Sequence, residues 1–226
     1  MPTYARKHQL SSSLIYHIYN RSHGRVPIFR CEDDFGYFMN LLKEYSMKFI
    51  LKIYHWVIMS NHFHLLLEMK EPELVSRFMA GLAKAYSRYH HKAYSASGYL
   101  WEGRFKLQPV QKESYLIACG RYIERNPVSA NMVNQAYEYS YSSARFYCIG
   151  ETDDITSEDP AFSEFGMDLN CRRNAYVEFL CNFDEEEEKL FDNLEQPEGN
   201  KEFIRRLLKE NGRFVPRRRG RPRKRI

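Results

Sequence analysis

The chain has 226 residues, with 34 Lys and Arg against 29 Asp and Glu, and 43% of its residues are hydrophobic. This is enough for one substantial core and predicts one main domain with appendages. No run approaches the ~18 consecutive apolar residues of a membrane span, so we do not expect insertion into a membrane. Met1–Ser13 lacks the apolar centre of a signal peptide, so we do not expect secretion. Five cysteines without a Cys-x-x-Cys pair argue against a disulfide framework or a cysteine zinc site and favour the cytoplasm.

Charged residues are distributed unevenly along the chain. Segment 1–150 has 19 Lys and Arg against 11 Asp and Glu, segment 151–200 has 3 against 16, and segment 201–226 has 12 against 2. The three segments therefore carry +8, −13 and +10, which sum to the net charge of +5. A basic body with a basic tail indicates a polyanionic partner, above all nucleic acid, and the alternative is a solvated surface without function.

The first half of the chain predicts a strand, a helix and a hairpin. Leu14–Asn20 is rich in β-formers, and Cys31–Lys48 has apolar residues at helical spacing with acids in its first turn. Phe49–Met59 and His62–Met69 are apolar, aromatic and β-branched runs separated by a short turn. They predict an antiparallel hairpin in which both strands are central.

A second helix is expected from Pro72 to the loop Ser95–Gly98, followed by a strand within Trp101–Gln111. A third helix should run over Ser114–Arg125, because Pro127 disfavours helical backbone in the residue before it. This order predicts an α+β fold of the ferredoxin-like or RRM-like kind, with an antiparallel sheet and helices on one face.

The composition changes beyond residue 150. An acidic linker, a helix over Asn174–Leu194 and a short helix over Lys201–Glu210 are expected there, followed by the basic tail. We therefore divide the chain into a main domain at 1–150, an acidic linker with a helical extension at 151–212, and a tail at 213–226.

The sharpest local pattern is His62-Phe63-His64 on the second strand of the hairpin. Because side chains alternate along a strand, the two imidazoles should project from one face about 6.6 Å apart, while Phe63 enters the opposite face. Two imidazoles directed at one point can bind a divalent ion. A structural, solvent-facing pair is the alternative, since the chain has eight histidines.

Tyr122 and Asn126 stand four residues apart, so a helix places the phenol and the carboxamide on the same face. An amide oxygen suits Mg²⁺ or Mn²⁺, and a tyrosine beside a neutralised phosphate can act as a nucleophile. Packing is the alternative role for Tyr122, because the chain has 17 tyrosines. Tyr115 lies two turns earlier and is a rival nucleophile, but its i+4 neighbour Cys119 is a soft ligand that suits Mg²⁺ poorly.

Three segments in chain order resemble the single-tyrosine HUH transposases, specifically the REP-associated tyrosine transposases. They are Val57–Glu68 (VIMSNHFHLLLE), Trp101–Phe105 (WEGRF) and Tyr122–Val128 (YIERNPV). The strand-borne His-x-His precedes the helix-borne Tyr-x-x-x-Asn-Pro, and the resemblance extends over roughly residues 14–150. Relatives from small insertion sequences carry glutamine in place of Asn126, so this asparagine favours the REP-associated branch.

The resemblance implies a metal-dependent DNA-nicking and strand-transfer enzyme that acts on single-stranded or hairpin, REP-like DNA. His62, His64 and Asn126 would bind Mg²⁺ or Mn²⁺. Tyr122, which alone is followed by the Asn-Pro of the family, would attack the scissile phosphate and form a 5′-phosphotyrosine link with a free 3′-hydroxyl. Another 3′-hydroxyl would reverse the step without ATP. Relatives include monomers and dimers, so a monomer and a homodimer are both open.

Two loops are expected to contact DNA as well. Arg21 and Arg25 follow the first strand, and Trp101, Arg104 and Phe105 precede a later one. Guanidinium groups and aromatic rings together hold single-stranded phosphates and bases. Core packing is the alternative for Trp101, and a solvated surface is the alternative for the arginines.

The tail segment Arg219-Gly-Arg-Pro-Arg223 resembles an AT-hook, which lies in the narrow minor groove of A·T-rich duplex DNA. Its expected contact residues are Arg219, Arg221, Arg223 and Lys224. The alternative is a generic polycation that binds DNA without A·T preference.

Two other functions stay open from the sequence. A non-catalytic nucleic-acid-binding module with an RRM-like sheet would explain the basic charge and the aromatic residues, but it gives His62, His64 and Asn126 no role. A metallohydrolase that activates water would need more acidic ligands, and Glu68 is the only acid on the strand of the histidine pair.

Overall fold

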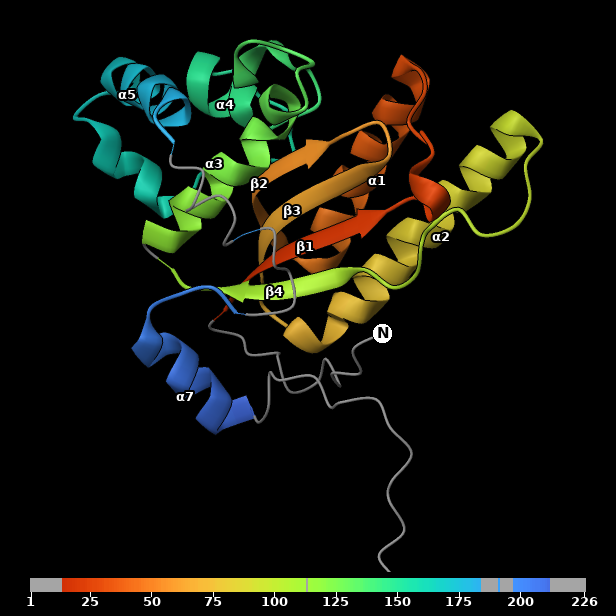
Figure 1. Cartoon of the computed structure of the whole chain (residues 1–226), viewed down its shortest axis with the longest axis horizontal. Helices are drawn as coiled ribbons and strands as arrows, with labels where there is room; N and C mark the ends of the chain where they lie inside the picture. Colours follow the sequence, from red (N-terminus) through yellow and green to blue (C-terminus); the bar gives the residue numbers. More distant parts are fainter. Residues whose placement is uncertain (1–13, 113, 184–190, 192–196, 212–226) are drawn as a thin grey trace, which may run out of the picture.

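The computed structural model describes residues 14–112, 114–183, 191 and 197–211. From residue 15 to residue 129, the strands and α-helices follow one another in the order β-α-β-β-α-β-α (Figure 1). Its strands are β1 (Ile15–Arg21), β2 (Leu51–Ile58), β3 (His62–Met69) and β4 (Lys106–Val110). Its helices are α1 (Glu32–Phe49), α2 (Val75–Tyr94), α3 (Ser114–Ser129), α4 (Ala144–Ile149), α5 (Leu169–Cys181) and α7 (Lys201–Asn211). Short 3-10 helices are η2 (His23–Arg25), η3 (Pro72–Leu74), η4 (Ala136–Glu138) and η5 (Pro160–Phe165).

The four strands form one antiparallel sheet in the order β2-β3-β1-β4. This strand order, combined with the first six elements of the chain, is the ferredoxin-like arrangement. The predicted α+β fold class is therefore confirmed.

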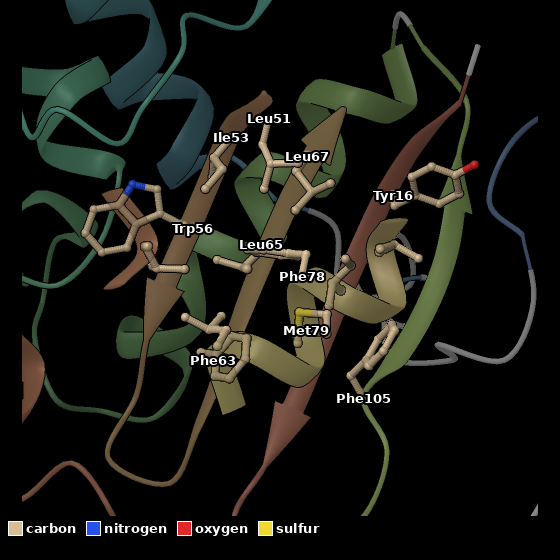
Figure 2. Close-up of a cluster of buried hydrophobic side chains, with 14 of the residues drawn as sticks. Tyr16, Leu51, Ile53, Trp56, Phe63, Leu65, Leu67, Phe78, Met79 and Phe105 are labelled. Carbon is tan, nitrogen blue, oxygen red and sulfur yellow. The ribbon is translucent and has the colours of Figure 1, made fainter. Parts of the chain in front are cut away.

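Apolar side chains on both faces of the sheet allow helices to cover both. The first face carries Phe63 and Leu65 of β3, which pack against Phe78 and Met79 of α2 (Figure 2). In Figure 1, α1 and α2 pass behind the sheet on this side. On the other face, Leu66 belongs to a second cluster with apolar residues of α3. The expectation of helices on one face thus describes α1 and α2, and α3 adds a further layer.

Strand β2 differs from its predicted position. It forms an end of the sheet and pairs only with β3 among the four strands, so it is not central. Its burial misled the sequence interpretation, because isolated bridges from Ser142 to Val57 and from Thr156 to Ile53 cover parts of the strand. Thr156 also accepts the indole N–H of Trp56 at 2.9 Å.

Of the described residues after position 150, those of η5 and α5 pack against α3. Helix α5 begins with Asp168, whose side chain accepts from the backbone N–H groups of Asn170 and Cys171, and it ends at Cys181. The expected helix over 174–194 therefore starts earlier, and positions 184–190 and 192–196 lie outside the described residues. The domain boundaries at 150 and 212 stay predictions. Within the described ranges, no helix has the length and apolar character needed to cross a bilayer.

Candidate active site

His62 and His64 lie at the start of β3, on the face of the sheet that α3 covers. Their ring centroids are 5.3 Å apart. Phe63, between them, is buried in the core of the opposite face. Strand alternation therefore produces the paired imidazoles that the sequence suggested.

Both imidazoles have a protonation state that suits metal binding. Burial lowers the pKa of His62 to about 4, against the opposing effect of a hydrogen bond to Asn126. Burial and the neighbouring His17 and His62 rings hold the pKa of His64 well below its usual value. Both rings are therefore neutral near pH 7, and a metal binds only the neutral imidazole.

Asn61 fixes the tautomer of His62. Its Nδ2 donates to the carbonyl oxygen of Arg25 at 2.9 Å, so its Oδ1 faces Nδ1 of His62 at 2.6 Å. An amide oxygen can only accept, and Nδ1 of His62 must therefore carry the proton. The lone pair of the neutral ring is then on Nε2, the atom left to bind a metal ion.

Asn126 turns its amide oxygen toward the histidines. Its Nδ2 donates to the carbonyl oxygens of Tyr122 at 2.9 Å and Ile123 at 3.2 Å, within its own helix. The remaining polar atom, Oδ1, is turned toward His62, where an acceptor favours the charged imidazole and so opposes the lowering of the pKa of this histidine. Two imidazoles and one amide oxygen therefore converge.

The same bonds explain why α3 is longer than predicted. The helix continues through Pro127 to Ser129, whereas the sequence predicted an end at Arg125. Pro127 has no N–H to donate to the carbonyl of Ile123 four residues earlier. Asn126 donates to that carbonyl instead, so no helical acceptor is orphaned by the proline.

Tyr122 lies beside the histidines. Its ring centroid is 5.7 Å from that of His64 and 5.8 Å from that of His17. On another side it meets Phe191 at 5.8 Å. Tyr115 packs, partly buried, against the core cluster under α3. Of the two candidate nucleophiles, Tyr122 is the one whose ring contacts histidines among the residues that the structure describes.

The donor set fits a divalent ion of the Mg²⁺ or Mn²⁺ kind. Imidazole nitrogen and amide oxygen are both ligands that Mn²⁺ accepts, and three protein ligands leave positions for phosphate oxygens. In the described ranges no group of three or more His, Cys, Asp or Glu side chains could hold a metal ion. If a divalent ion binds here, the amide oxygen of Asn126, which is turned toward His62, would be the third protein ligand beside the two imidazoles.

Arg21 brings positive charge to the edge of the site. It lies directly opposite His62 in the β1–β3 register, and its charge contributes to the low pKa of that histidine. Its guanidinium forms an ion pair with Glu102, which belongs to the loop before β4. Backbone bonds hold the two loops together, with the N–H of Glu102 donating to the carbonyl of Arg21.

The other predicted DNA contacts have mixed surroundings. Trp101 packs against the main core, and its indole N–H donates to the carbonyl of Ala83 at 3.1 Å. Arg25 and Arg104 are exposed in the two loops beside His62. DNA contact by these residues stays a prediction, and Arg219, Arg221, Arg223 and Lys224 of the tail lie outside the described residues.

The sequence interpretation missed His17 and Tyr19 on β1. The ring of His17 stacks on His64 with centroids 5.1 Å apart, and Tyr19 lies 4.8 Å from His64. A signal was present, because His17 and Tyr19 alternate on a predicted strand. Only the strand pairing, which sets Tyr19 opposite His64, brings them to the site.

A buried ionic network holds α3 against the sheet. His55 of β2 contacts Glu124 of α3 through Nδ1 at 2.8 Å and Asp159 through Nε2 at 3.0 Å. All three side chains are fully buried. Gly120 permits the close approach, because a Cβ at this position would come within 2.6 Å of the His55 ring. The helix is thus held against His55 at Gly120 and at Glu124, two residues before and two residues after Tyr122.

We expect this network to make stability depend on pH. Burial alone would lower the pKa of His55, but the two carboxylates raise it to about 9, above the value of 6.5 for an unfolded chain. The stabilisation is therefore complete below pH 6.5 and is lost as the pH rises through about 9. The unfolding free energy from urea titrations should fall by roughly 3 kcal/mol between these limits. A His55→Gln variant should lack this fall, and an equal fall in both proteins would contradict the charged state of His55.

Comparisons with known proteins found a matching family model and solved structures with similarity to this chain. A family model described as IS200-like transposase matches residues 10–126, which is more than half of the chain. The solved structure of a REP-associated tyrosine transposase bound to a REP hairpin has the same fold, with a TM-score of 0.53 and 16% identity, over 70% of this chain and 94% of that chain. A transposase-like protein from Deinococcus radiodurans R1 is less similar, with a TM-score of 0.38 and 18% identity, over 53% of this chain and 90% of that chain. No curated protein matches significantly.

Proposed function

Since the chain belongs to the IS200-like transposase family, we propose that it nicks and rejoins single-stranded or hairpin DNA in a metal-dependent reaction with Tyr122 as the nucleophile. The observation that carries this proposal is the meeting of Tyr122 and Asn126 from α3 with His62 and His64 from β3. A transposase-like role follows from the family alone. The nucleophile, the ion and the DNA substrate are the proposed parts.

In the proposed reaction the Oη of Tyr122 forms a bond to the scissile phosphorus. The bond from phosphorus to the 3′-oxygen breaks, the phenolic proton passes to solvent, and the leaving 3′-oxygen takes up a proton. The products are a 5′-phosphotyrosine link and a free 3′-hydroxyl. Because the link retains the phosphodiester, a second 3′-hydroxyl can displace Tyr122 and join the strands without ATP.

The side chains around Tyr122 contribute mainly position and charge. His62, His64 and Asn126 would hold a divalent ion, which supplies positive charge to the phosphate oxygens when it is bound. The rings of His17 and Phe191 flank the Tyr122 ring and restrict its direction. A nucleophile held in this way loses little freedom when it reacts.

The proposed substrate is single-stranded DNA beside a hairpin. The structural neighbour of the same fold was solved with a REP hairpin bound to it. In this chain Arg21 ends β1 beside His62, and Arg25 and Arg104 lie in adjacent loops at the same end of the sheet, where the three can contact phosphates. The Glu102 partner of Arg21 has to yield to a phosphate oxygen for this contact to form.

Removing one imidazole tests the metal site. We expect His64→Ala to weaken Mn²⁺ binding by about 100-fold or more in isothermal titration calorimetry and to abolish nicking, because a direct ligand is lost. EDTA should stop nicking by the wild type. His23→Ala is the matched control, since this histidine is exposed in a neighbouring loop and should bind Mn²⁺ as the wild type does. Unchanged affinity in His64→Ala would exclude the proposed ligand set.

Deleting Arg217–Ile226 tests the tail. We expect weaker duplex binding and a flatter dependence of log K on log salt, by about 0.9 per lost phosphate contact, with nicking of a hairpin substrate largely retained. Fluorescence anisotropy with A·T-rich and G·C-rich duplexes measures both effects. A larger loss on A·T-rich DNA supports the AT-hook, an equal loss supports a generic polycation, and an unchanged salt slope shows that the tail does not contact phosphates.

A further inference from the structure

A chain of hydrogen bonds leads from the ring of His64 across the sheet to its β4 edge. Nδ1 of His64 lies 2.8 Å from Nε2 of His17, and Nδ1 of His17 lies 3.2 Å from Oε1 of Gln108. Nε2 of Gln108 donates to Oε1 of Glu198 at 3.1 Å. The side chains come from β3, β1, β4 and the segment before α7, and the first three residues are buried.

The chain has a single direction when Glu198 is ionised. A carboxylate only accepts, so Gln108 presents its NH₂ group to Glu198 and its carbonyl oxygen to His17. His17 must then donate from Nδ1, and a ring that carries one proton on Nδ1 has its lone pair on Nε2, the atom that lies 2.8 Å from His64. That lone pair accepts the Nδ1 proton of His64. The lone pair of His64 is therefore on Nε2.

Glu198 is held at this place by backbone pairing and by α7. Its N–H donates to the carbonyl of Pro109 at 2.9 Å, and its carbonyl accepts from the N–H of Gln111 at 2.8 Å, so it extends the β4 edge of the sheet. Helix α7, which follows, inserts Phe203 and Leu207 into the main core. Figure 1 shows α7 beyond β4, on the side of the sheet edge where this pairing occurs.

We propose that Glu198, Gln108 and His17 are positioning residues that set the tautomer and orientation of His64, so that its Nε2 lone pair faces the metal position. This inference rests on the metal site of the proposed function. These residues would act on His64 as Asn61 acts on His62. The series of hydrogen bonds, however, begins at Glu198, which lies 134 positions after His64 in the chain. The acidic segment 151–200 thereby contributes a residue to the site.

The tautomer of His64 can be measured without any metal. We would label histidine with ¹⁵N and record long-range ¹H–¹⁵N spectra of the metal-free protein at pH 8, because burial raises the pKa of Glu198 to about 7. The wild type should show His64 with a protonated Nδ1 and an unprotonated Nε2. In Gln108→Leu the acceptor for His17 is lost, and His64 should show a mixture of tautomers or the Nε2-protonated form.

Two further variants distinguish an effect of hydrogen-bond direction from a general disruption of the structure. Glu198→Ala removes only the terminal acceptor and should shift the tautomer in the same sense, even if Gln108→Leu fails to fold. The double variant Gln108→Glu with Glu198→Gln keeps an acceptor toward His17 and a donor between positions 198 and 108, so it should restore the wild-type tautomer. Glu202→Ala, an exposed acid at the start of α7, is the control for loss of charge.

Metal affinity provides the second readout. Gln108→Leu and Glu198→Ala should bind Mn²⁺ about 10- to 100-fold more weakly, and the double variant should recover most of the loss. A wild-type His64 with the proton on Nε2, or a tautomer that is the same in every variant, would overturn the inference whatever the metal result. If the tautomer responds as expected but the wild type binds no Mn²⁺, the positioning of His64 stands and the metal site of the proposed function fails.

Discussion

Tyr122→Phe should form no covalent protein–DNA adduct on hairpin-bearing single-stranded DNA, whereas the wild type should form one that needs a divalent metal. The variant loses only the phenolic oxygen, so the ring keeps its contacts with His17, His64 and Phe191. We expect at least about 10³-fold less adduct, because the proposed nucleophile is removed. Binding to the same DNA should change less than about threefold, since a hydroxyl group at most contributes about one hydrogen bond. A denaturing gel with labelled oligonucleotide measures the adduct.

Tyr115→Phe is the matched control on the same helix. It makes the same chemical change two turns before Tyr122 and should leave adduct formation unchanged, because Tyr115 packs, partly buried, against the second core cluster. An adduct that persists in Tyr122→Phe and disappears in Tyr115→Phe would transfer the role to Tyr115. If neither protein nor the wild type forms an adduct on a broad set of hairpins while DNA binding persists, the non-catalytic binding module becomes the better description.

Glu124→Leu should produce the largest loss of stability. Its carboxylate accepts from His55 at 2.8 Å, from Ser143 at 2.6 Å and from Tyr176 at 2.9 Å, and it is fully buried. Leucine leaves these donors without their acceptor and leaves a charged imidazole facing Asp159 alone. Breaking a buried ionic group of this kind costs about 3–5 kcal/mol, which corresponds to a melting temperature lower by roughly 10 °C for a chain of this length.

Graded variants check this interpretation by calorimetry and urea unfolding. Tyr176→Phe removes one donor from the network and should cost about 1–2 kcal/mol. Asp154→Asn weakens an exposed pair with Lys43 and should change stability by less than about 1 kcal/mol. A Glu124→Leu protein as stable as Asp154→Asn would show that the network contributes specificity of packing rather than stability.

Elements with a local pattern could be predicted from the sequence. Runs of β-forming and apolar residues marked β1 and β3, helical spacing marked α1 and α2, and each was found within a few residues of its expected bounds. The relation of His62 to His64 and that of Tyr122 to Asn126 follow from the geometry of one strand and one helix. These pairs were therefore identifiable without any knowledge of tertiary contacts.

Two errors came from hydrogen-bond partners that the hydrophobic pattern and the proline rule do not take into account. The burial of β2 indicated a central strand, although Ser142 and Thr156, which lie 85 and 103 positions after their partners Val57 and Ile53, provide the cover. The proline rule predicted an end of α3 before Pro127, but the side chain of Asn126 satisfies the carbonyl that the proline leaves without a donor. In both cases a distant or side-chain partner replaced the expected local one.

By itself, the sequence determined which residues this protein offers for chemistry: an imidazole pair, a tyrosine and an amide, each presented by the periodicity of a single element. Only the tertiary structure decided that they meet, because β3 and α3 approach each other through strand register and through the network of His55 and Glu124. It also decided the parts played by His17 and Glu198, whose contacts depend on pairing across 47 and 90 positions of the chain. Such pairings arise from sheet topology, which a local sequence pattern does not encode.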